Sequence, residues 1–575
     1  MKLTKGQKKF IRTNYSKFTL EELAIKTKLP QESVKAYLKK LGKDTKITAY
    51  KNDMKASNLA IELKTADDFL QFFRANIDFI TILVVFCLIV YAVALNGEFI
   101  SDDIPGFVNN PSIKQYPQSI GQFNLQNIIY SLFYNLFGTE QLPLHLFSLC
   151  LHILNTVLVI VLVSNIFGKR VAMITSLIFA LHPVNTEAVS WISAINYLTN
   201  ATTFLIVAIS YVWYKNTKAY KWPVTPTILF FGMLLISQNP WSLVIPFLIL
   251  LIDQLFLEKK INIKSAIKIS PMFLSIPLLL VFLQSVLQSK IELTGGLAGR
   301  QEPLYKTIPY TIFKTLELLI FPKNLTIYHE GEPITTVKYN LMIIATIITF
   351  SLIVYLWKKN ERTYAGLIAM IFIAISPVFS PIQVAWFIAD RYLYISTIAF
   401  GILVALFLLK LEKKTKNNAL TLVLLTLLVV TYSARSIKRN TDWKTRKSLW
   451  EATAQTSPNS ARVHNNLGDV YALEGNYERA VSEFQIALLI NPTYFEAMHN
   501  LGFTYMRAGD LDNAETYLKK SYEINPQLFQ STYKLGLIET QRGNREKAIE
   551  YFEKTVEINP NFIEAQTALK ALHEN

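Results

Sequence analysis

Cysteine is nearly absent from the sequence, which has two in 575 residues, Cys87 and Cys150. Both stand in long apolar runs, where a small, soft side chain packs well, so they indicate no disulfide framework. Several catalytic motifs are absent as well, namely an H-E-x-x-H, a cysteine cluster, a Walker loop and a serine nucleophile elbow. These absences argue against zinc peptidases of that type, P-loop nucleotide hydrolases and α/β-hydrolases.

Charged residues are few, at 17% of the chain, whereas 51% of the residues are hydrophobic. The apolar residues gather in runs long enough to cross a bilayer, which predicts an all-α, polytopic membrane protein. Because the first run begins only at residue 79, we expect an anchor that stays in the membrane and not a cleaved signal. About eleven spans are expected. They lie at 79–95, 144–167, 171–187, 197–214, 225–239, 241–257, 269–288, 340–357, 363–379, 394–410 and 419–434.

Lysine and arginine mark one side of the predicted bundle. If the spans alternate, the short basic loops all lie on the side of the N-terminus. The loops at 96–142, 188–196, 236–241 and 380–393 fall on the other side and are nearly free of basic residues. The positive-inside rule therefore places the N-terminus in the cytoplasm and these loops outside.

Two segments do not fit this alternation. Residues 305–322 are apolar but short, and they contain Lys314 and Glu317 between Pro309 and Pro322. We interpret them as an interfacial or re-entrant outer helix, with a further span as the alternative. The stretch SARSIKRNTDWKTRKSLW carries six basic residues on the predicted outer side. We keep the C-terminal part outside because the spans before an inverted loop can overrule it.

Proline and glycine recur every 34 residues in the C-terminal part. The recurring positions are Pro458, Pro492, Pro526 and Pro560, and Gly468, Gly502 and Gly536. This period is typical of tetratricopeptide repeats and predicts a repeat domain with a capping helix at 459–575, after a linker and half repeat at 436–458. Stacked helix pairs form a concave groove, which we expect to bind a protein or peptide, with a rigid spacer or assembly contact as the alternative.

Residues 1–46 form a basic module, with 13 Lys and Arg against 4 Asp and Glu. Helices at 20–27 and 31–41 resemble a helix-turn-helix. We expect this cytoplasmic module to contact the anionic membrane surface or a protein, with nucleic acid as the alternative, since no dimerisation element is visible. Residues 47–77 are a linker or amphipathic segment before the membrane part at 78–435.

Polar residues gather at the predicted outer ends of the spans, where charge is costly and therefore indicates function. Three groups stand out: Asp102 and Asp103 in the first outer loop, His182 and Glu187 beside a helix-interrupting Pro183, and Arg391 and Tyr394 before a later span. Each has a structural alternative. An acidic pair often caps a helix, a histidine can pack at the interface, and an arginine can anchor a span at the headgroups.

These side chains suit transfer of a group from a phosphate-bearing lipid to a hydroxyl. A carboxylate can accept the hydroxyl proton, and an arginine can hold the leaving phosphate with its forked donors. We expect Asp102 and Asp103 to be catalytic, one as the base and the other orienting a group or binding a cation, because neighbours in an extended loop point opposite ways. The residues assigned to the donor are His182, Glu187, Arg391 and Tyr394.

Several motifs in a fixed order resemble the transmembrane and tetratricopeptide O-mannosyltransferases. They are the acidic pair followed by FVNNPSI, the LHILNTVLVIVLV span, RVAMITSLIFALHPVNTEAVSWIS, DRYLYIS, the RSIKRNTDWKTRKSLW linker and the repeats. The resemblance covers roughly residues 75–575 and implies a GT-C fold related to protein O-mannosyltransferases. It also implies a polyprenyl-phosphate sugar donor, inverting transfer and a catalytic aspartate at Asp102 and, less directly, Asp103. The family's longer repeat arrays and lack of a basic N-terminal module leave the sugar and the acceptor open.

The leading hypothesis is an integral-membrane glycosyltransferase that moves a sugar, mannose by the resemblance, to a protein or envelope acceptor. The composition suits a prokaryotic plasma membrane, with the repeats outside. One alternative is a non-catalytic repeat scaffold for envelope assembly, and another is a transporter of a lipid-linked substrate. No cofactor is expected with certainty, although a divalent cation at Asp103 would suit an oxygen-rich site with a lipid phosphate.

Overall fold

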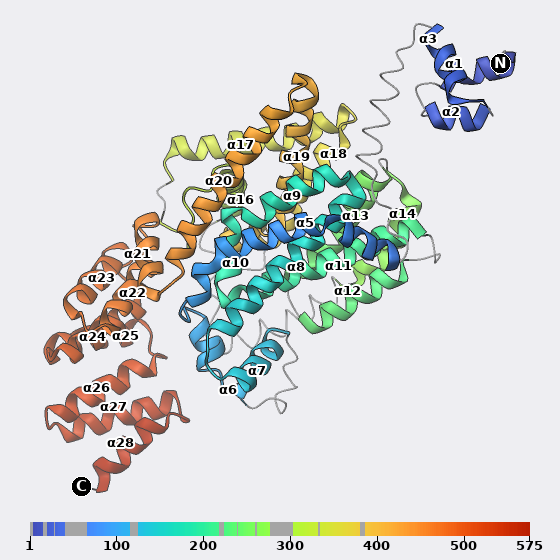
Figure 1. Cartoon of the computed structure of the whole chain (residues 1–575). Coiled ribbons are helices and arrows are strands. Elements are labelled where there is room, and N and C mark those ends of the chain that lie inside the picture. Colours follow the sequence, from blue (N-terminus) through green and yellow to red (C-terminus); the bar gives the residue numbers. More distant parts are fainter. Residues whose placement is uncertain are drawn as a thin grey trace.

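The computed structural model describes residues 4–14, 20–27, 29–40, 66–114, 125–217, 223–237, 240–258, 261–275, 303–331, 334–379 and 386–574. Every regular element in these ranges is helical, which confirms the predicted all-α class. Figure 1 shows a small helical module at the N-terminal end, a central helix bundle and a C-terminal array, with the two termini at opposite ends.

The N-terminal module consists of three short helices around one small core. They are α1 (Lys5–Asn14), α2 (Leu20–Thr27) and α3 (Gln31–Lys40). Helices α2 and α3 lie where the sequence predicts them, and α1 adds the buried Ile11 to a core of Leu23, Val34 and Leu38. The end of the second predicted helix at Leu41 and the linker up to residue 65 lie outside the described residues.

The central bundle is built mainly from apolar helices. They are α5 (Ala66–Tyr91), α8 (Leu142–Phe167), α9 (Lys169–Leu181), α11 (Ile195–Thr217), α12 (Val224–Ser237), α13 (Ile245–Leu251), α14 (Ile263–Ile269), α16 (Leu304–Ile320), α17 (Thr336–Lys358), α18 (Arg362–Ala374), α19 (Ser396–Thr415) and α20 (Asn418–Asp442). Among the residues that the structure describes, five helices could cross a membrane by length and composition: Asp68–Asn96, Leu142–Phe167, Ile192–Thr217, Thr336–Lys358 and Asn418–Asp442. The count of eleven spans stays a prediction, and most of the expected span at 269–288 lies outside the described residues.

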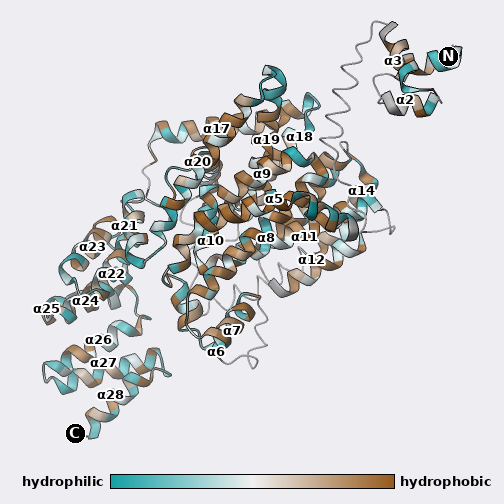
Figure 2. Ribbon diagram, in the orientation of Figure 1, coloured by the Kyte–Doolittle hydropathy of each residue, from teal (hydrophilic) through white to brown (hydrophobic). Residues whose placement is uncertain are grey.

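Burial separates the middle of the bundle from its rim. Helix α11 is mostly covered by other helices, whereas α17 leaves large apolar side chains such as Leu341, Ile344 and Ile348 exposed. Figure 2 shows that hydrophobic residues dominate these helices, while the C-terminal array is largely hydrophilic. An apolar helix that is exposed in the isolated chain is expected where lipid covers it.

Pro183 interrupts the third apolar run, as the sequence predicts. Helix α9 ends at Leu181, and the chain continues through a short turn into α10 (Thr186–Ser190). The missing backbone N–H and the fixed φ of proline explain why the helix does not continue. This break turns the residues that follow, including Glu187, into the interior of the bundle.

The basic residues at the end of α20 are held by the protein. Arg435 donates hydrogen bonds to the carbonyl oxygens of Pro322 and Lys323, and the buried Arg439 pairs with Asp442 at 3.2 Å. A guanidinium that is satisfied or buried inside the protein is a weak topology signal, because it does not face the headgroups. This accounts for two of the basic residues that lie against the positive-inside trend.

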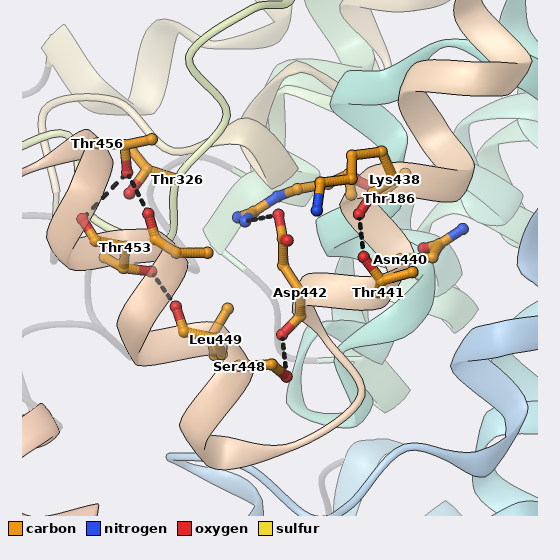
Figure 3. Close-up of polar contacts among 12 residues, drawn as sticks. Thr186, Thr326, Lys438, Asn440, Thr441, Asp442, Ser448, Leu449, Thr453 and Thr456 are labelled. Atoms are coloured by element: carbon orange, nitrogen blue, oxygen red, sulfur yellow. Dashed lines mark hydrogen bonds and ion pairs between the residues drawn. The ribbon is translucent and has the colours of Figure 1, made fainter.

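Helix α20 leads directly into the repeats. After a turn at 443–445 the chain begins α21 (Arg446–Thr456), whose capping box joins Thr445 and Ser448. The Ser448 hydroxyl also donates to the carbonyl oxygen of Asp442, at 3.0 Å, so the turn is tied to the end of α20 (Figure 3). Such caps contribute about 1 kcal/mol each and make the connection stiff.

The C-terminal helices pair as tetratricopeptide repeats. They are α22 (Ala461–Leu473), α23 (Tyr477–Ile490), α24 (Phe495–Ala508), α25 (Leu511–Ile524), α26 (Phe529–Gln541), α27 (Arg545–Ile558) and α28 (Ile563–Glu574). The recurring glycines lie where two helices of a repeat touch, since a Cβ at Gly468 or Gly536 would come within 2.9 Å of a phenylalanine ring carbon. Substitution there would force the pair apart.

Candidate functional site

The acidic pair of the first outer loop divides into one exposed and one buried residue. Asp102 is exposed, and its side chain makes no hydrogen bond with a described residue. Directly before it, Ser101 adopts a φ of 53°, a left-handed conformation that costs a serine roughly 1–3 kcal/mol. Backbone strain of this kind persists only where surrounding contacts hold a loop in place. Here the hydrogen bonds of Asp103 provide these contacts.

Asp103 is 1% exposed and binds two parts of the chain. One carboxylate oxygen accepts a hydrogen bond from the Ile100 backbone N–H at 2.9 Å, and the other accepts from the backbone N–H and hydroxyl of Ser193. Burial raises the pKa of the Asp103 carboxyl to about 7, although these hydrogen bonds oppose the rise. Asp103 therefore fastens the loop that presents Asp102.

Glu187 and Arg391 form a buried ion pair, far apart in the sequence. One Glu187 oxygen accepts from the Arg391 guanidinium and the other from its backbone N–H, at 2.9 Å. Glu187 is fully buried and Arg391 is 5% exposed. A buried charge that loses its partner costs several kcal/mol, so the two residues depend on each other.

Arg391 begins a stack of four side chains. Its guanidinium lies 5.0 Å from the ring centre of Trp191, and Trp191 stacks on Trp443 with ring centres 6.0 Å apart. On the far side, the Arg439 guanidinium lies 5.3 Å from the Trp443 ring. The Trp191 indole N–H donates to the Ile100 carbonyl oxygen, which ties the stack to the loop of Asp102.

The far end of this stack holds hydrogen-bond donors without acceptors. Arg439 uses one nitrogen on Asp442, whereas its Nε and Nη2 and the Nε1 of Trp443 find no partner within the described part of the chain. Buried donors of this kind are rare in native proteins and each needs a water, an ion or a ligand. Sequence reasoning missed Arg439 because it read the stretch as a basic linker.

His182 and Tyr394, two residues assigned to the donor from the sequence, are buried in the bundle. The His182 ring bonds the carbonyl oxygen of Leu319 at 3.0 Å and accepts from the Val184 N–H. The Tyr394 hydroxyl bonds the His152 ring at 2.7 Å. These contacts hold both side chains inside the bundle, and their assignment to the donor stays a prediction.

A segment between α16 and α17, residues 326–331, joins the site to the repeats; we call it the outer segment. Its Tyr328 carbonyl accepts from the Ser457 hydroxyl at 2.7 Å, and its Glu330 accepts from the Ser460 hydroxyl at 3.0 Å. A Cβ at Gly331, where φ is +69°, would collide with the backbone of Asn459 and lie 2.7 Å from the Ser460 nitrogen. The membrane part and the first repeat are therefore in close contact.

Two residues of the outer segment reach the site itself. The His329 ring bonds a carboxylate oxygen of the buried Asp390 at 2.8 Å, next to Arg391. Tyr328 belongs to the buried cluster that also contains Ile100 and Trp191, and burial raises its pKa to about 12. The sequence offered one signal for these residues: a Tyr-His-Glu run in a loop on the predicted outer side.

No cation site emerges at the acidic pair. Within the described ranges, no group of three or more His, Cys, Asp or Glu side chains could hold a metal ion. Both oxygens of Asp103 already accept hydrogen bonds, so the cation role predicted for this residue finds no support in its surroundings.

Comparisons with known proteins agree with the repeats and with the family resemblance seen in the sequence. Family models described as "Tetratricopeptide repeat" and "TPR repeat" match residues 493–561 and 468–509. Protein O-mannosyl-transferase F38B6.6 of Caenorhabditis elegans is 26% identical over 446 residues, which cover 72% of this chain and 63% of that protein. The chain resembles the protein O-mannosyl-transferases.

This resemblance to protein O-mannosyl-transferases extends to other animals. TMTC3 of Mus musculus is 25% identical over 406 residues, covering 64% of this chain and 44% of the mouse protein. TMTC1 of Homo sapiens is 24% identical over 481 residues, covering 71% of this chain and 54% of the human protein. The resemblance predicted from the sequence is confirmed, and the matched regions span between 44% and 63% of these relatives.

Proposed function

We propose that the protein is an integral-membrane glycosyltransferase of the GT-C type, which moves a sugar from a polyprenyl-phosphate donor to a hydroxyl of a protein or envelope acceptor. Two findings support the proposal: the resemblance to protein O-mannosyl-transferases, and an exposed Asp102 on a loop fixed by its buried neighbour Asp103. The second carries the proposal, because a free carboxylate on a rigid loop suits general-base catalysis. Mannose is the sugar that the relatives' names suggest.

In this proposal Asp102 is the base. As the acceptor oxygen forms its bond to the anomeric carbon, Asp102 takes the hydroxyl proton. The bond between the anomeric carbon and the phosphate oxygen breaks, and its electron pair stays on the phosphate. A single displacement of this kind inverts the configuration at the anomeric carbon.

The leaving phosphate needs cationic donors, and we propose that Arg439 supplies them. Arg391, the residue assigned to this task from the sequence, already neutralises Glu187 inside the protein. Arg439 pairs with Asp442 through one nitrogen only, and its Nε and Nη2 and the Trp443 Nε1 find no partner among the described residues. Both residues belong to the same stack as Arg391. Forked guanidinium donors match phosphate oxygens well, and in a dry site each such bond is strong. Glu187 and Arg391 would then position the stack.

The repeats would hold the acceptor outside the membrane, with the N-terminus in the cytoplasm. The contacts of Arg435 and Arg439 inside the protein remove part of the objection that the linker is too basic for the outer side. The membrane we propose is the prokaryotic plasma membrane.

The decisive experiment uses the full chain in lipid nanodiscs with radiolabelled polyprenyl-phosphate mannose and a cell-envelope extract. Wild type is expected to label an acceptor, and Asp102→Asn is not. Glu140→Gln is the matched control, since Glu140 is another exposed carboxylate of the same outer loop. Equal labelling by wild type and Asp102→Asn would refute the catalytic assignment and favour a non-catalytic scaffold.

A further inference from the structure

A cavity of about 800 Å³ lies between the membrane part and the first repeats. One wall comes from the start of α16, the start of α17 and the outer segment, with His329 and Glu330 among its residues. The opposite wall comes from the turn before α22 and the turn between α23 and α24, with Arg462 and Tyr494. Ligand sites of proteins commonly have this size and lie between domains.

The lining combines aromatic rings and amides with three charged side chains of both signs, Lys306, Glu330 and Arg462. Tyr310, Phe387 and Tyr494 contribute rings, and Asn459 and Asn491 contribute side-chain amides. Aromatic faces pack apolar side chains, whereas an amide can both donate to and accept from a peptide backbone. Because Glu330 lies among the cationic side chains and the rings, the lining suits a polypeptide better than a free phosphate or a lipid chain.

The repeats differ from one another where they line this cavity. At the position of Arg462 the later repeats have Glu496 and Gln530, and at the position of Tyr494 they have Leu528 and Phe562. The first repeat has Ser460 at that second position, where its hydroxyl contacts Glu330. The first two repeats therefore carry residues suited to the membrane part, and Arg462 is one of them.

Arg462 connects the cavity to the candidate site. Its guanidinium lies 4.6 Å from the ring centre of Trp386 and 5.8 Å from that of Tyr328. The same Tyr328 belongs to the buried cluster that contains Ile100, two residues before Asp102. The outer segment therefore lines the cavity and shares a buried cluster with the loop that carries Asp102.

We propose that this cavity binds an extended segment of the acceptor polypeptide, with a serine or threonine next to an apolar or aromatic residue. The inference rests on the proposed function, since it takes the acceptor to be a polypeptide hydroxyl. It adds that the acceptor binds at the edge of the repeat array and not in its concave groove. The cavity lies at the start of α22 and at the turn before α24, whereas the helices α26 to α28 lie farther along the array (Figure 1). The apolar neighbour would pack on Tyr310 and Tyr494.

The test is photo-crosslinking of the full chain in nanodiscs. The probe is a pool of synthetic peptides, each with a central threonine, randomised flanks and one benzophenone side chain. Crosslinked sites are mapped by mass spectrometry in wild type, Tyr494→Leu and Arg462→Gln. Both replacements place at the cavity a residue that a later repeat carries at the same position, so the repeat fold tolerates them. Phe562→Leu makes the same aromatic-to-leucine change outside the cavity.

Crosslinks are expected on the two cavity walls in wild type and Phe562→Leu. Tyr494→Leu and Arg462→Gln should lower them about tenfold, the loss typical of removing one packed contact residue. Crosslinks confined to the concave faces of α24 and α26, or an equal yield in all four proteins, would overturn the inference, as would a complete lack of crosslinks. If crosslinks map to the cavity but no sugar is transferred by wild type, the cavity still binds peptide and only the proposed function fails.

Discussion

Asp102 and Asp103 are consecutive residues whose carboxyl groups meet opposite surroundings, one exposed and the other buried with three hydrogen bonds. The pair lies in a turn and not in the extended loop that the sequence predicts, since Ser101 is left-handed and Asp103 has helical backbone angles at the start of η2 (Ile104–Val108). This turn directs only the Asp103 carboxyl onto Ile100 and Ser193. We therefore expect Asp102→Asn to change activity and Asp103→Asn to change stability, so the two substitutions can distinguish the roles of these residues.

For Asp102→Asn we expect a loss of sugar transfer by about 10²- to 10⁴-fold, the usual contribution of a general base. The free energy of unfolding should change by less than about 0.5 kcal/mol, because the exposed side chain makes no described hydrogen bond. Transfer assays and thermal unfolding on the same nanodisc samples check both numbers. A variant that unfolds earlier and transfers normally would contradict the assignment.

Asp103 predicts a pH dependence of stability. Burial raises the pKa of its carboxyl from 3.8 to about 7, so between these values the folded protein holds a proton that the unfolded chain has released. The free energy of unfolding should therefore fall as the pH rises from about 4 to about 7. The stability that protonated Asp103 contributes is fully present only below about pH 4. Asp103→Asn removes the titration, so its melting temperature should depend less on pH over this range than that of wild type. Parallel curves for the two proteins would contradict the prediction.

Gly331 predicts a local loss of contact between the membrane part and the repeats. Gly331→Ala should weaken the contact, because its Cβ would collide with Asn459, whereas Gly138→Ala has a similar positive φ but open space around the new atom. Both variants should lose roughly 1–2 kcal/mol to backbone strain. Only Gly331→Ala should also raise hydrogen exchange at 326–331 and 457–461. Equal exchange in both variants would show that the contact tolerates the side chain.

The position of Arg439 predicts that its substitution changes donor binding more than turnover. Arg439→Gln should raise the KM for the lipid-phosphate donor, because the free guanidinium donors are lost, and Arg439→Lys should restore only part of the affinity. The matched control is Arg435→Gln, whose arginine already donates to two carbonyl oxygens and should leave the donor KM unchanged. Steady-state kinetics with purified donor decide the matter. An unchanged donor KM in Arg439→Gln would assign this residue to packing alone.

Local patterns in the sequence were sufficient for much of the fold. The 34-residue period predicted the repeats, and Pro183 predicted the break after α9, because both depend on neighbours along the chain. The hydropathy of single runs predicted where helices form in the bundle. It did not settle how many cross the membrane, since α9 and α13 are short.

Contacts between distant residues could be predicted only in part. The sequence grouped Glu187 and Arg391 on one side of the membrane, but not as partners of each other. His182 stood beside an outer loop and was assigned to the donor, whereas the packing of α16 covers its ring. Arg439 looked like an ordinary linker residue because its burial depends on Trp443, Trp191 and Arg391 stacking together. No property of a single segment contains that information.

The stiff connection between α20 and α21 limits how far the repeats can move relative to the bundle. Helix α20 runs from Asn418 to Asp442, and after a turn at 443–445 the chain continues in α21, whose start is capped by Thr445, so only a short, hydrogen-bonded turn separates the bundle from the array. In the proposed function, the repeats then stay at a fixed height above the lipid surface. Such an enzyme would modify polypeptides that can bring a flexible stretch down to that height, which favours chains that are still emerging or unfolded over compact, finished domains.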